Sequence, residues 1–583
     1  MILTNKVRCF FCNPRSPIPD PRKNTTYPLL LICILGSVFA RTPDAVGENG
    51  MVVSSHRLAS EAGVEVLQNG GNAIDAAIAT GFALAVVHPG AGNIGGGGFM
   101  VIRLADGRVT TIDFRETAPA AAFRDMFLDD SLNVIPGKSW NTAWAAGVPG
   151  SVAGFGMAFE KYGSTNWREL IQPAAKLAFN GFPLDYQNMR YFNHPYYKEY
   201  LSNDTETSKI FSKEESFSLN ETFIQKDLGL TLNRISKKGW REFYTGKTAD
   251  MIVNCMQRTD GLITKKDLQK YRAVERAPIS FNYREYEVHS MPPASSGGIT
   301  IAGILNQLEN IDLDSLDYHS AQHIHYVAEA ERRVYADRAE FMGDMDFVPV
   351  PIDRLISDEY ANNRWKSVDS LIASKSDDIS HGDIPFDYKE SEETTHYSVV
   401  DKWGNAVSVT TTINGWFGNG IVVDGAGFLL NNEMDDFSAK PGVPNAYGLV
   451  GNTANAIEPE KRMLSSMSPT IVETPDGELF LVVGSPGGST IITTTAQIIM
   501  NVVDFDMILE DAVESPRFHH QWLPDMIQFE SRGFTIETIM ALKSRGHDTK
   551  YRGSIGEANC IQVQDGFIYG SADSRRNSSA VGY

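Results

Sequence analysis

The chain has 583 residues, of which 42% are apolar, 21% charged and 10% aromatic. This is enough apolar material for a large core, so the composition excludes a disordered or fibrous chain. Asp and Glu outnumber Lys and Arg by 72 to 52, which gives a formal net charge of −20. An acidic chain without a basic block argues against nucleic acid as the main partner.

The first 40 residues differ from the rest of the chain. A lead rich in Lys and Arg is followed by an uncharged apolar stretch from Pro28 to Ala40, with small residues at Ser37 and Ala40. This pattern predicts an export signal that is cut near Ala40, and hence a periplasmic or extracellular protein. An uncleaved membrane anchor is the alternative, although the apolar stretch is short for a spanning helix, which needs about 20 residues.

Cysteines are few outside this leader. Cys9, Cys12 and Cys33 lie within it, which leaves only Cys255 and Cys560 in the remainder of the chain. Two cysteines make neither a disulfide framework nor a multi-cysteine metal site.

The first half of the chain is predicted to be mainly helical. The helical pattern begins at residues 54–87, and residues 99–104 and 109–114 read as two strands around an Asp-Gly turn. Residues 150–345 look mostly helical, most clearly at 318–342. We expect the charges of this last helix to lie on a solvated face: Glu329, Arg332, Arg333 and Arg338.

Three histidines lie near the start of that helix. His319, His323 and His325 do not have the spacing of a strong zinc pattern, and the sequence places no carboxylate as a third ligand. A structural role is therefore favoured over metal binding.

The second half of the chain is rich in strand signals. Residues 367–393 are polar and acidic and are expected to be exposed and mobile. A hairpin is predicted from residues 396–401 and 406–413, and further strands at 470–472 and 479–483. A helix is expected at 491–503. Helices and sheets in layers predict an α/β or α+β fold.

Thr394 lies at the junction between the acidic segment and the first strand of this hairpin. In an intact chain it is simply a good strand residue. If the peptide bond before it were cut, Thr394 would carry a hydroxyl nucleophile and a free α-amine together. An α-amine has a pKa near 8 in model compounds, which suits a general base at neutral pH. The amine would activate a hydroxyl that is otherwise a poor nucleophile.

Several motifs in the same order resemble the γ-glutamyltransferases, also called γ-glutamyl transpeptidases. The likeness runs from about Gly50 to Tyr583, nearly the whole chain after the leader. The motifs are Asn93-Ile-Gly-Gly-Gly-Gly-Phe-Met100, Asp113-Phe-Arg-Glu116, Ser290-Met-Pro-Pro-Ala-Ser-Ser-Gly-Gly298, Thr394–Asp401, Asn431-Asn-Glu-Met-Asp-Asp-Phe-Ser438, Leu464-Ser-Ser-Met-Ser-Pro-Thr470 and Gly484-Ser-Pro-Gly-Gly-Ser489.

The resemblance implies a precursor that cleaves itself between Glu393 and Thr394. The products are a large subunit of residues 41–393 and a small subunit of residues 394–583, which stay together as a heterodimer. The implied fold is the α+β, N-terminal-nucleophile αββα sandwich, in which two stacked sheets lie between helical layers.

The resemblance also assigns the catalytic groups. Thr394 is the nucleophile and, through its amine, the base. Thr412 lies on the returning strand, where an antiparallel hairpin can bring its hydroxyl opposite Thr394. The backbone N–H groups of Gly487 and Gly488 can point at a developing oxyanion, a role worth about 3–4 kcal/mol per donor. Alone, Thr412 is an ordinary strand residue and Pro486-Gly487 an ordinary turn.

A γ-glutamyl group ends in an α-ammonium and an α-carboxylate. The carboxylate suits the planar fork of Arg115, helped by Ser465 and Ser466. The ammonium needs acceptors, and the resemblance assigns this role to Asn414, Glu433 and Asp436. Many relatives carry Gln where this chain has Glu433. Tyr447, in a loop of residues 440–450 that is rich in Pro and Gly, resembles a lid residue.

The implied activity is transfer of a γ-glutamyl group from glutathione or another γ-glutamyl compound to water, amino acids or dipeptides, with no metal or organic cofactor. A related acylase of the glutaryl or cephalosporin type is one alternative, but its substrate lacks the α-ammonium. A silent binding protein would not need Thr394 and Thr412. A metallohydrolase lacks an HExxH or comparable pattern.

Overall fold

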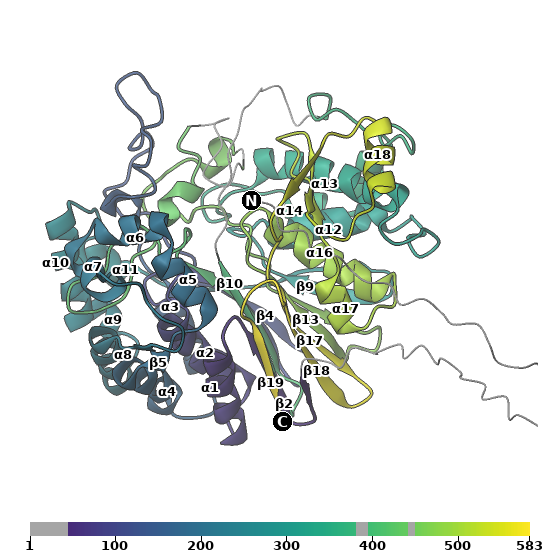
Figure 1. Ribbon diagram of the computed structural model, residues 1–583. Helices are drawn as coiled ribbons and strands as arrows, with labels where there is room; N and C mark the ends of the chain where they lie inside the picture. Colours follow the sequence, from purple (N-terminus) through teal and green to yellow (C-terminus); the bar gives the residue numbers. More distant parts are fainter. Residues whose placement is uncertain (1–44, 380–393, 441–448, 450) are drawn as a thin grey trace, which may run out of the picture. The chain divides into compact units, whose positions relative to one another are not determined.

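Two seven-stranded antiparallel sheets form the centre of the molecule in the computed structural model (Figure 1). The structure describes residues 45–379, 394–440, 449 and 451–583. The first sheet has the order β1 (Ala45–Gly47), β18 (Phe567–Ala572), β17 (Asn559–Gln564), β13 (Leu479–Val483), β12 (Thr470–Glu473), β9 (Tyr286–Ser290) and β8 (Ile279–Tyr283). The second has the order β19 (Ser579–Gly582), β2 (Gly50–Ser54), β10 (Thr395–Asp401), β11 (Ala406–Thr412), β3 (Gly97–Arg103), β4 (Val109–Asp113) and β7 (Val274–Arg276).

The two sheets stack face to face, and alternate residues of each strand reach different layers. In β2, Met51 and Val53 belong to an apolar cluster between the sheets, together with Ile471 and Val482 of the other sheet. Val52, between them, belongs to the cluster on the helical side. A period of two is what strands buried on both faces require.

Helices cover the outer face of each sheet (Figure 1). One layer packs on the second sheet: α1 (Arg57–Gln68), α2 (Ala73–Val87), α3 (Ser151–Tyr162), α4 (Trp167–Asn180), α5 (Tyr186–Asn193), α6 (Pro195–Ser202), α7 (Thr205–Phe211), α8 (Lys226–Lys238), α9 (Glu242–Thr245), α10 (Lys247–Thr259) and α11 (Lys265–Lys270). The other packs on the first sheet: α12 (Gly297–Leu308), α13 (Ala321–Phe341), α14 (Ile352–Leu355), α15 (Asp358–Trp365), α16 (Thr490–Val503), α17 (Leu509–Glu514) and α18 (Ile536–Ser544). This confirms the predicted αββα sandwich.

Shorter elements complete the chain. A three-stranded sheet packs against α16 through β14, and a two-stranded sheet joins the loops after α4 and α7. The remaining elements are β14 (Phe518–His519), β15 (Ile527–Glu530), β16 (Thr549–Arg552), β5 (Phe182–Pro183), β6 (Thr222–Phe223) and the 3₁₀ turns η1 (Ala143–Ala145), η2 (Glu433–Asp436) and η3 (Thr453–Asn455).

The predicted local elements are largely confirmed. The strands expected at 99–104 and 109–114 are β3 and β4, and the hairpin after Thr394 is the pair β10 and β11. The apolar segment 76–87 is the body of α2, whose side chains are all buried, as its uniformly apolar sequence requires.

The solvated face predicted for residues 318–342 is wrong. Glu329, Arg332, Arg333 and Arg338 of α13 are each no more than 3% exposed. The helix packs against α12 and α18, and residues from the 367–376 segment cover its charged side. Periodicity indicates which side of a helix is polar, but it does not reveal whether another part of the chain covers that side.

The segment expected to be exposed and mobile is described only up to Ile379. Ser376 accepts a hydrogen bond from Arg332, and the carbonyl oxygens of Ser376 and Ile379 accept from Trp522, so this part is held against the core. Residues 380–393 and Tyr447 lie outside the described residues, as does the leader. In the part that the structure describes, every helix is too short or too polar to cross a membrane.

Candidate active site

Thr394 directly precedes β10, and the register of the hairpin determines its neighbour. Thr395 of β10 pairs with Thr411 of β11, so the next residues outward, Thr394 and Thr412, lie across from each other. Both are nearly buried, at 4% and 3% exposure, and both line one small cavity. The backbone N–H of Asn414 donates to Oγ1 of Thr412 over 2.8 Å, which orients that hydroxyl.

The cavity collects most of the residues predicted for the site, although they come from distant parts of the sequence. Nine of the ten predicted catalytic and substrate-binding residues belong to its wall or touch a residue that does, and Gly487 is next in sequence to one. The lining residues are Arg115, Arg338, Thr394, Thr412, Asn414, Asp436, Leu449, Leu464, Ser465, Ser466, Met467, Gly488 and Ile491.

A larger cavity, of about 800 Å³, lies at the other end of β10, among the hairpin turns of the two sheets. The charged Arg103 in its wall is already paired with Glu473 and with backbone carbonyls, and Asp401 accepts bonds from Ala73 and Trp403. Its size does not make it the active site, because neither Thr394 nor any other predicted site residue reaches it.

Arg115 follows β4 and is completely buried. Its Nη1 donates to Oε2 of Glu433 over 2.5 Å, its Nη2 pairs with Asp436, and its Nε donates to the carbonyl oxygen of Met463. Burial by itself would lower the pKa of Arg115, but Glu433, Asp436 and Glu116 raise it above its usual value. The cation predicted for the substrate carboxylate and two acceptors predicted for the ammonium therefore contact each other directly.

The carboxyl groups of this cluster do not all ionise easily. Burial raises the pKa of Glu116 to about 8 and raises that of Glu433 well above its ordinary value, although Arg115 opposes both shifts. Burial also raises the pKa of Asp436, although Arg115 opposes this shift. Three carboxyl groups around one guanidinium thus share fewer than three negative charges at neutral pH.

Ser465 and Ser466 lie in a loop that the 290–298 motif holds in place. The backbone N–H of Ser465 donates to the carbonyl oxygen of Ala294, and the N–H of Ser296 donates back to that of Ser465, over 2.9 and 2.8 Å. Both serines line the same cavity as Thr394. Two hydroxyls beside a cation can bind a carboxylate.

Gly487 and Gly488 lie differently with respect to the cavity. Gly488 belongs to the cavity wall, just before the N-terminus of α16, whereas Gly487 is not among the residues lining it. Both have a positive φ, 134° and 56°, and a Cβ at Gly487 would lie 2.5 Å from Oγ1 of Thr490. The turn therefore favours glycine. Backbone N–H groups near a helix N-terminus suit a developing negative charge.

Sequence reasoning missed Arg338, which was predicted to be solvated but lines this cavity. Arg338 reaches the cavity through contacts with residues far away in the sequence, so the periodicity of its own helix could not predict this position.

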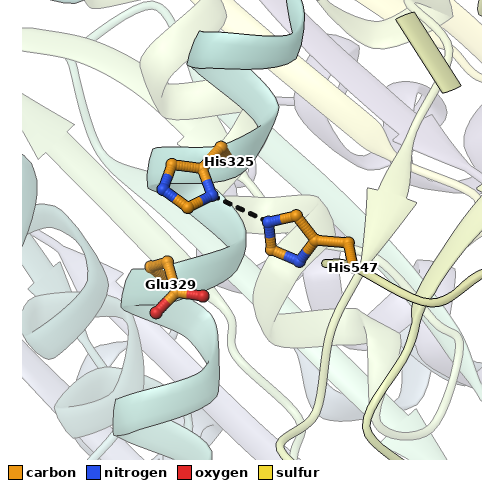
Figure 2. A group of neighbouring side chains, drawn as sticks. All are labelled: His325, Glu329 and His547. Carbon is orange, nitrogen blue, oxygen red and sulfur yellow. Dashed lines mark hydrogen bonds between the residues drawn. The ribbon is translucent and has the colours of Figure 1, made fainter. Parts of the chain in front are cut away.

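Figure 2 shows His325 and Glu329, one turn apart on α13, facing His547. The sequence pattern indicates no carboxylate ligand beside these histidines, but the fold brings Glu329 close to His325 and His547. Nε2 of His325 lies 2.8 Å from the carbonyl oxygen of Asp369, which only accepts, so this nitrogen carries the proton. Nδ1 of His325 then accepts from Nε2 of His547 over 2.7 Å. The two histidines therefore form a neutral hydrogen-bonded pair.

The charges around this group oppose a metal ion. Glu329 is the counter-ion of Arg332 and Arg333, whose positive charges hold its pKa at about 2 against the effect of burial. Burial lowers the pKa of His547 to about 3. A divalent cation would add two charges next to two guanidinium groups, which makes a structural role the better reading.

Comparison with known proteins shows extensive likeness. A family model described as "Gamma-glutamyltranspeptidase" matches residues 59–583, which include every residue that lines the cavity. A "Glutathione hydrolase proenzyme" of Escherichia coli strain K12 is 50% identical over 531 residues, which is 91% of this chain and 90% of that protein. A protein of the same name from Pseudomonas sp. strain A14 is 46% identical and covers 96% of this chain and 100% of its own length. The solved structure of Helicobacter pylori gamma-glutamyltranspeptidase is 44% identical, with a TM-score of 0.56, and covers 58% of this chain and 96% of that one.

Proposed function

Because the chain belongs to the γ-glutamyltranspeptidase family, we propose that it is a γ-glutamyltransferase and glutathione hydrolase with Thr394 as its nucleophile. The observation that carries this proposal is the cavity at the start of β10. It combines two threonines, a guanidinium, carboxyl groups and two serines in one place. γ-Glutamyl transfer needs a nucleophile in the same cavity as the groups that bind a zwitterion.

The precursor matures by cleavage of the peptide bond between Glu393 and Thr394, which gives a large subunit of residues 41–393 and a small subunit of residues 394–583. The relatives from E. coli and Pseudomonas are both named proenzymes, which supports a precursor. Strands from both products alternate in the second sheet, where β10 and β11 lie between β2 and β3. The two subunits therefore share one core and stay associated as a heterodimer after the cut.

The reaction follows from the groups at the cavity. Oγ1 of Thr394 attacks the γ-carbonyl carbon of the donor while the Thr394 amine takes the hydroxyl proton. The oxyanion receives hydrogen bonds from backbone N–H groups of the turn that contains Gly488, with Gly487 as its neighbour. The C–N bond then breaks, the amine returns the proton to the leaving nitrogen, and a γ-glutamyl ester remains on Thr394. Water or the amine of an acceptor completes the transfer.

The substrate head group matches the charges of the cavity. The α-ammonium binds Asn414, Glu433 and Asp436, and the α-carboxylate binds Arg115 with the Ser465 and Ser466 hydroxyls. A glutaryl donor lacks the ammonium and makes no use of these acceptors, so the cavity favours γ-glutamyl over glutaryl transfer. Amino acids and dipeptides are the proposed acceptors.

Two further assignments belong to the proposal. The leader of residues 1–40 directs export to the periplasm or the cell exterior, with the matured enzyme released or held by an anchor. Tyr447 closes over the acyl-enzyme and limits the access of water.

The test is a substitution of the nucleophile. Wild-type protein should run as two chains on a denaturing gel, with a second N-terminus at Thr394, and should release p-nitroaniline from γ-glutamyl-p-nitroanilide. Thr394→Ala should remain one uncut, inactive chain, because alanine has no hydroxyl. Thr395→Ser, which changes the next residue but keeps its hydroxyl, should still be cut. A Thr394→Ala chain that splits at this bond would show that the self-cleavage assignment is wrong.

A further inference from the structure

Arg338 brings a second guanidinium to the candidate active site. It projects from α13, is 3% exposed, and lines the same cavity as the predicted nucleophile. Its Nε donates to Oγ of Ser296 over 2.9 Å, and its Nη2 donates to Oγ of Ser466 over 3.2 Å. Oγ of Ser296 in turn donates to the carbonyl oxygen of Ser465 over 2.7 Å. Arg338 thus supports both serines of the loop, one directly and one through Ser296.

The charge of Arg338 is not compensated in the way that the charge of Arg115 is. Across the described residues, no carboxylate oxygen lies within 4.0 Å of the Arg338 guanidinium, whereas Arg115 has carboxylates at Glu116, Glu433 and Asp436. Burial lowers the pKa of Arg338 to about 10, with Tyr335 and Asp436 opposing the shift, so the side chain stays charged at neutral pH. A buried cation without a contacting anion is costly, and an anionic ligand relieves that cost.

The donors of Arg115 are already engaged. Glu433 and Asp436 occupy its two Nη atoms, and backbone oxygens of Met463 and Leu464 accept from Nε and Nη2. An incoming carboxylate therefore finds Arg115 only partly available until the substrate ammonium draws these two side chains away. Arg338 faces the cavity without such a competitor.

The hydrogen bond to Ser466 also has a direction that matters. An arginine only donates, so Oγ of Ser466 is the acceptor and its own O–H remains to donate elsewhere. A carboxylate placed between Ser465, Ser466 and Arg115 would receive that O–H. Arg338 would hold the hydroxyl in this orientation and add positive charge behind it.

We propose that Arg338 is a positioning and specificity residue for the α-carboxylate of the donor substrate, acting through Ser466 and through its own charge. The inference rests on the proposed γ-glutamyl transfer and adds a residue to its binding site. It predicts that Arg338 matters only for donors that carry this carboxylate.

The experiment compares three p-nitroanilides that differ in the head group. γ-Glutamyl carries the carboxylate and the ammonium, glutaryl carries only the carboxylate, and 4-aminobutyryl carries only the ammonium. Arg338→Met should reduce kcat/KM about 10- to 100-fold for the two carboxylate donors, mainly through KM, because hydrogen bonds to charged groups are worth about 1.5–3 kcal/mol. The value for the 4-aminobutyryl donor should change less than about twofold, and Arg338→Lys should recover part of the loss.

Arg364→Met is the matched control. Arg364 pairs with Asp337 and with the backbone of Arg333, so it steadies the same helix, but it does not line the cavity. This variant should affect the three donors equally or not at all. Ser466→Ala should reproduce the donor selectivity of Arg338→Met, and the double variant should lose less than the product of the two single losses.

Equal losses on all three donors in Arg338→Met would overturn the inference and leave the proposed function intact. A wild-type protein without activity on γ-glutamyl-p-nitroanilide would instead overturn the proposed function itself. If Arg338→Met remains uncut, Arg338→Lys carries the same comparison, because it keeps the charge and loses the planar fork. A lysine variant without any donor selectivity would also contradict the inference.

Discussion

Glu433 and Asp436 contact the same guanidinium but differ in what they can contribute. Burial raises the pKa of Glu433 well above its ordinary value, and the nearby Glu116 and Asp436 add to this shift. Burial also raises the pKa of Asp436, but two guanidinium groups, Arg115 and Arg338, oppose that rise. A protonated Glu433 beside an ionised Asp436, whose charge the two guanidinium groups stabilise, agrees with these directions. The negative charge for a substrate ammonium then resides mainly on Asp436.

This division predicts different outcomes for two isosteric substitutions. Glu433→Gln replaces a neutral carboxyl with a neutral amide that can still donate, so kcat/KM for γ-glutamyl-p-nitroanilide should stay within about threefold of wild type. Asp436→Asn removes the charge and should reduce kcat/KM roughly 10- to 100-fold, since a charge-assisted hydrogen bond is worth about 1.5–3 kcal/mol. Steady-state kinetics of both matured variants provides the measurement. Similar large losses in both would mean that Glu433 is ionised and essential.

At the level of elements, the site depends on how closely the chain before β3 approaches β11. A Cβ built at Gly96 would overlap the carbonyl oxygen of Thr412 and lie 2.8 Å from Oδ1 of Asn93. Asn93 in turn donates from Nδ2 to that same carbonyl oxygen over 2.9 Å. Gly96 has no positive φ, so its backbone conformation does not require glycine. Glycine is required here because the two chain segments approach so closely.

Gly96→Ala should consequently displace the end of β11 and with it Thr412. Overpacking in a rigid interior costs roughly 1–3 kcal/mol, so the melting temperature should fall and self-cleavage should slow at least about tenfold. Gly553→Ala is the control, because a Cβ there meets nothing within 4 Å and the residue has no positive φ. Thermal unfolding and a time course of chain cleavage would decide. Cleavage at the wild-type rate in Gly96→Ala would contradict the contact argument.

Local sequence patterns predicted the elements near Thr394 well, because each depends on neighbours in the chain. Alternation and a turn signal were enough for β10 and β11, whose register then brings Thr394 to Thr412. The place of Arg338 depends instead on residues 296, 465 and 466, which lie far away in the sequence. The covering of Glu329 by residue 374 and its approach to His547 are of the same kind. Contacts that the fold creates between distant segments leave no periodicity to read.

At the scale of the whole molecule, the buried His323 and the buried Glu557 act on stability with opposite signs. Burial lowers the pKa of His323 to about 4 and raises that of Glu557 to about 7. The unfolded chain takes up a proton on His323 below its ordinary pKa of about 6.5, so this residue reduces stability as the pH falls from 6.5 toward 4. The folded chain keeps a proton on Glu557 above about 4.3, so this residue reduces stability as the pH rises from there to 7. Between about pH 4.3 and 6.5 these two contributions therefore partly cancel.

Single substitutions should separate the two contributions. His323→Asn keeps an acceptor near the position of Nδ1, which accepts from the backbone N–H of His319 over 3.1 Å, but it cannot titrate. Relative to its parent, its free energy of unfolding should rise by on the order of 1 kcal/mol per pH unit as the pH falls from 6 to 4.5, with pH 7.5 as the reference. Glu557→Gln should show the reverse, a relative gain as the pH rises from 5 to 7.

The measurement is denaturant unfolding in the uncut Thr394→Ala chain, in which both halves remain covalently joined. Joining them removes subunit dissociation from the equilibrium, so the difference between variant and parent reports on the titrating group. Parallel pH curves for His323→Asn and its parent would mean that His323 takes up its proton in the folded state at the same pH as in the unfolded chain. Parallel curves for Glu557→Gln would mean that Glu557 ionises there as it does in the unfolded chain. Opposite slopes would establish that burial dominates both pKa values, at Glu557 even against Arg576, whose Nε lies 3.6 Å from Oε2 of Glu557.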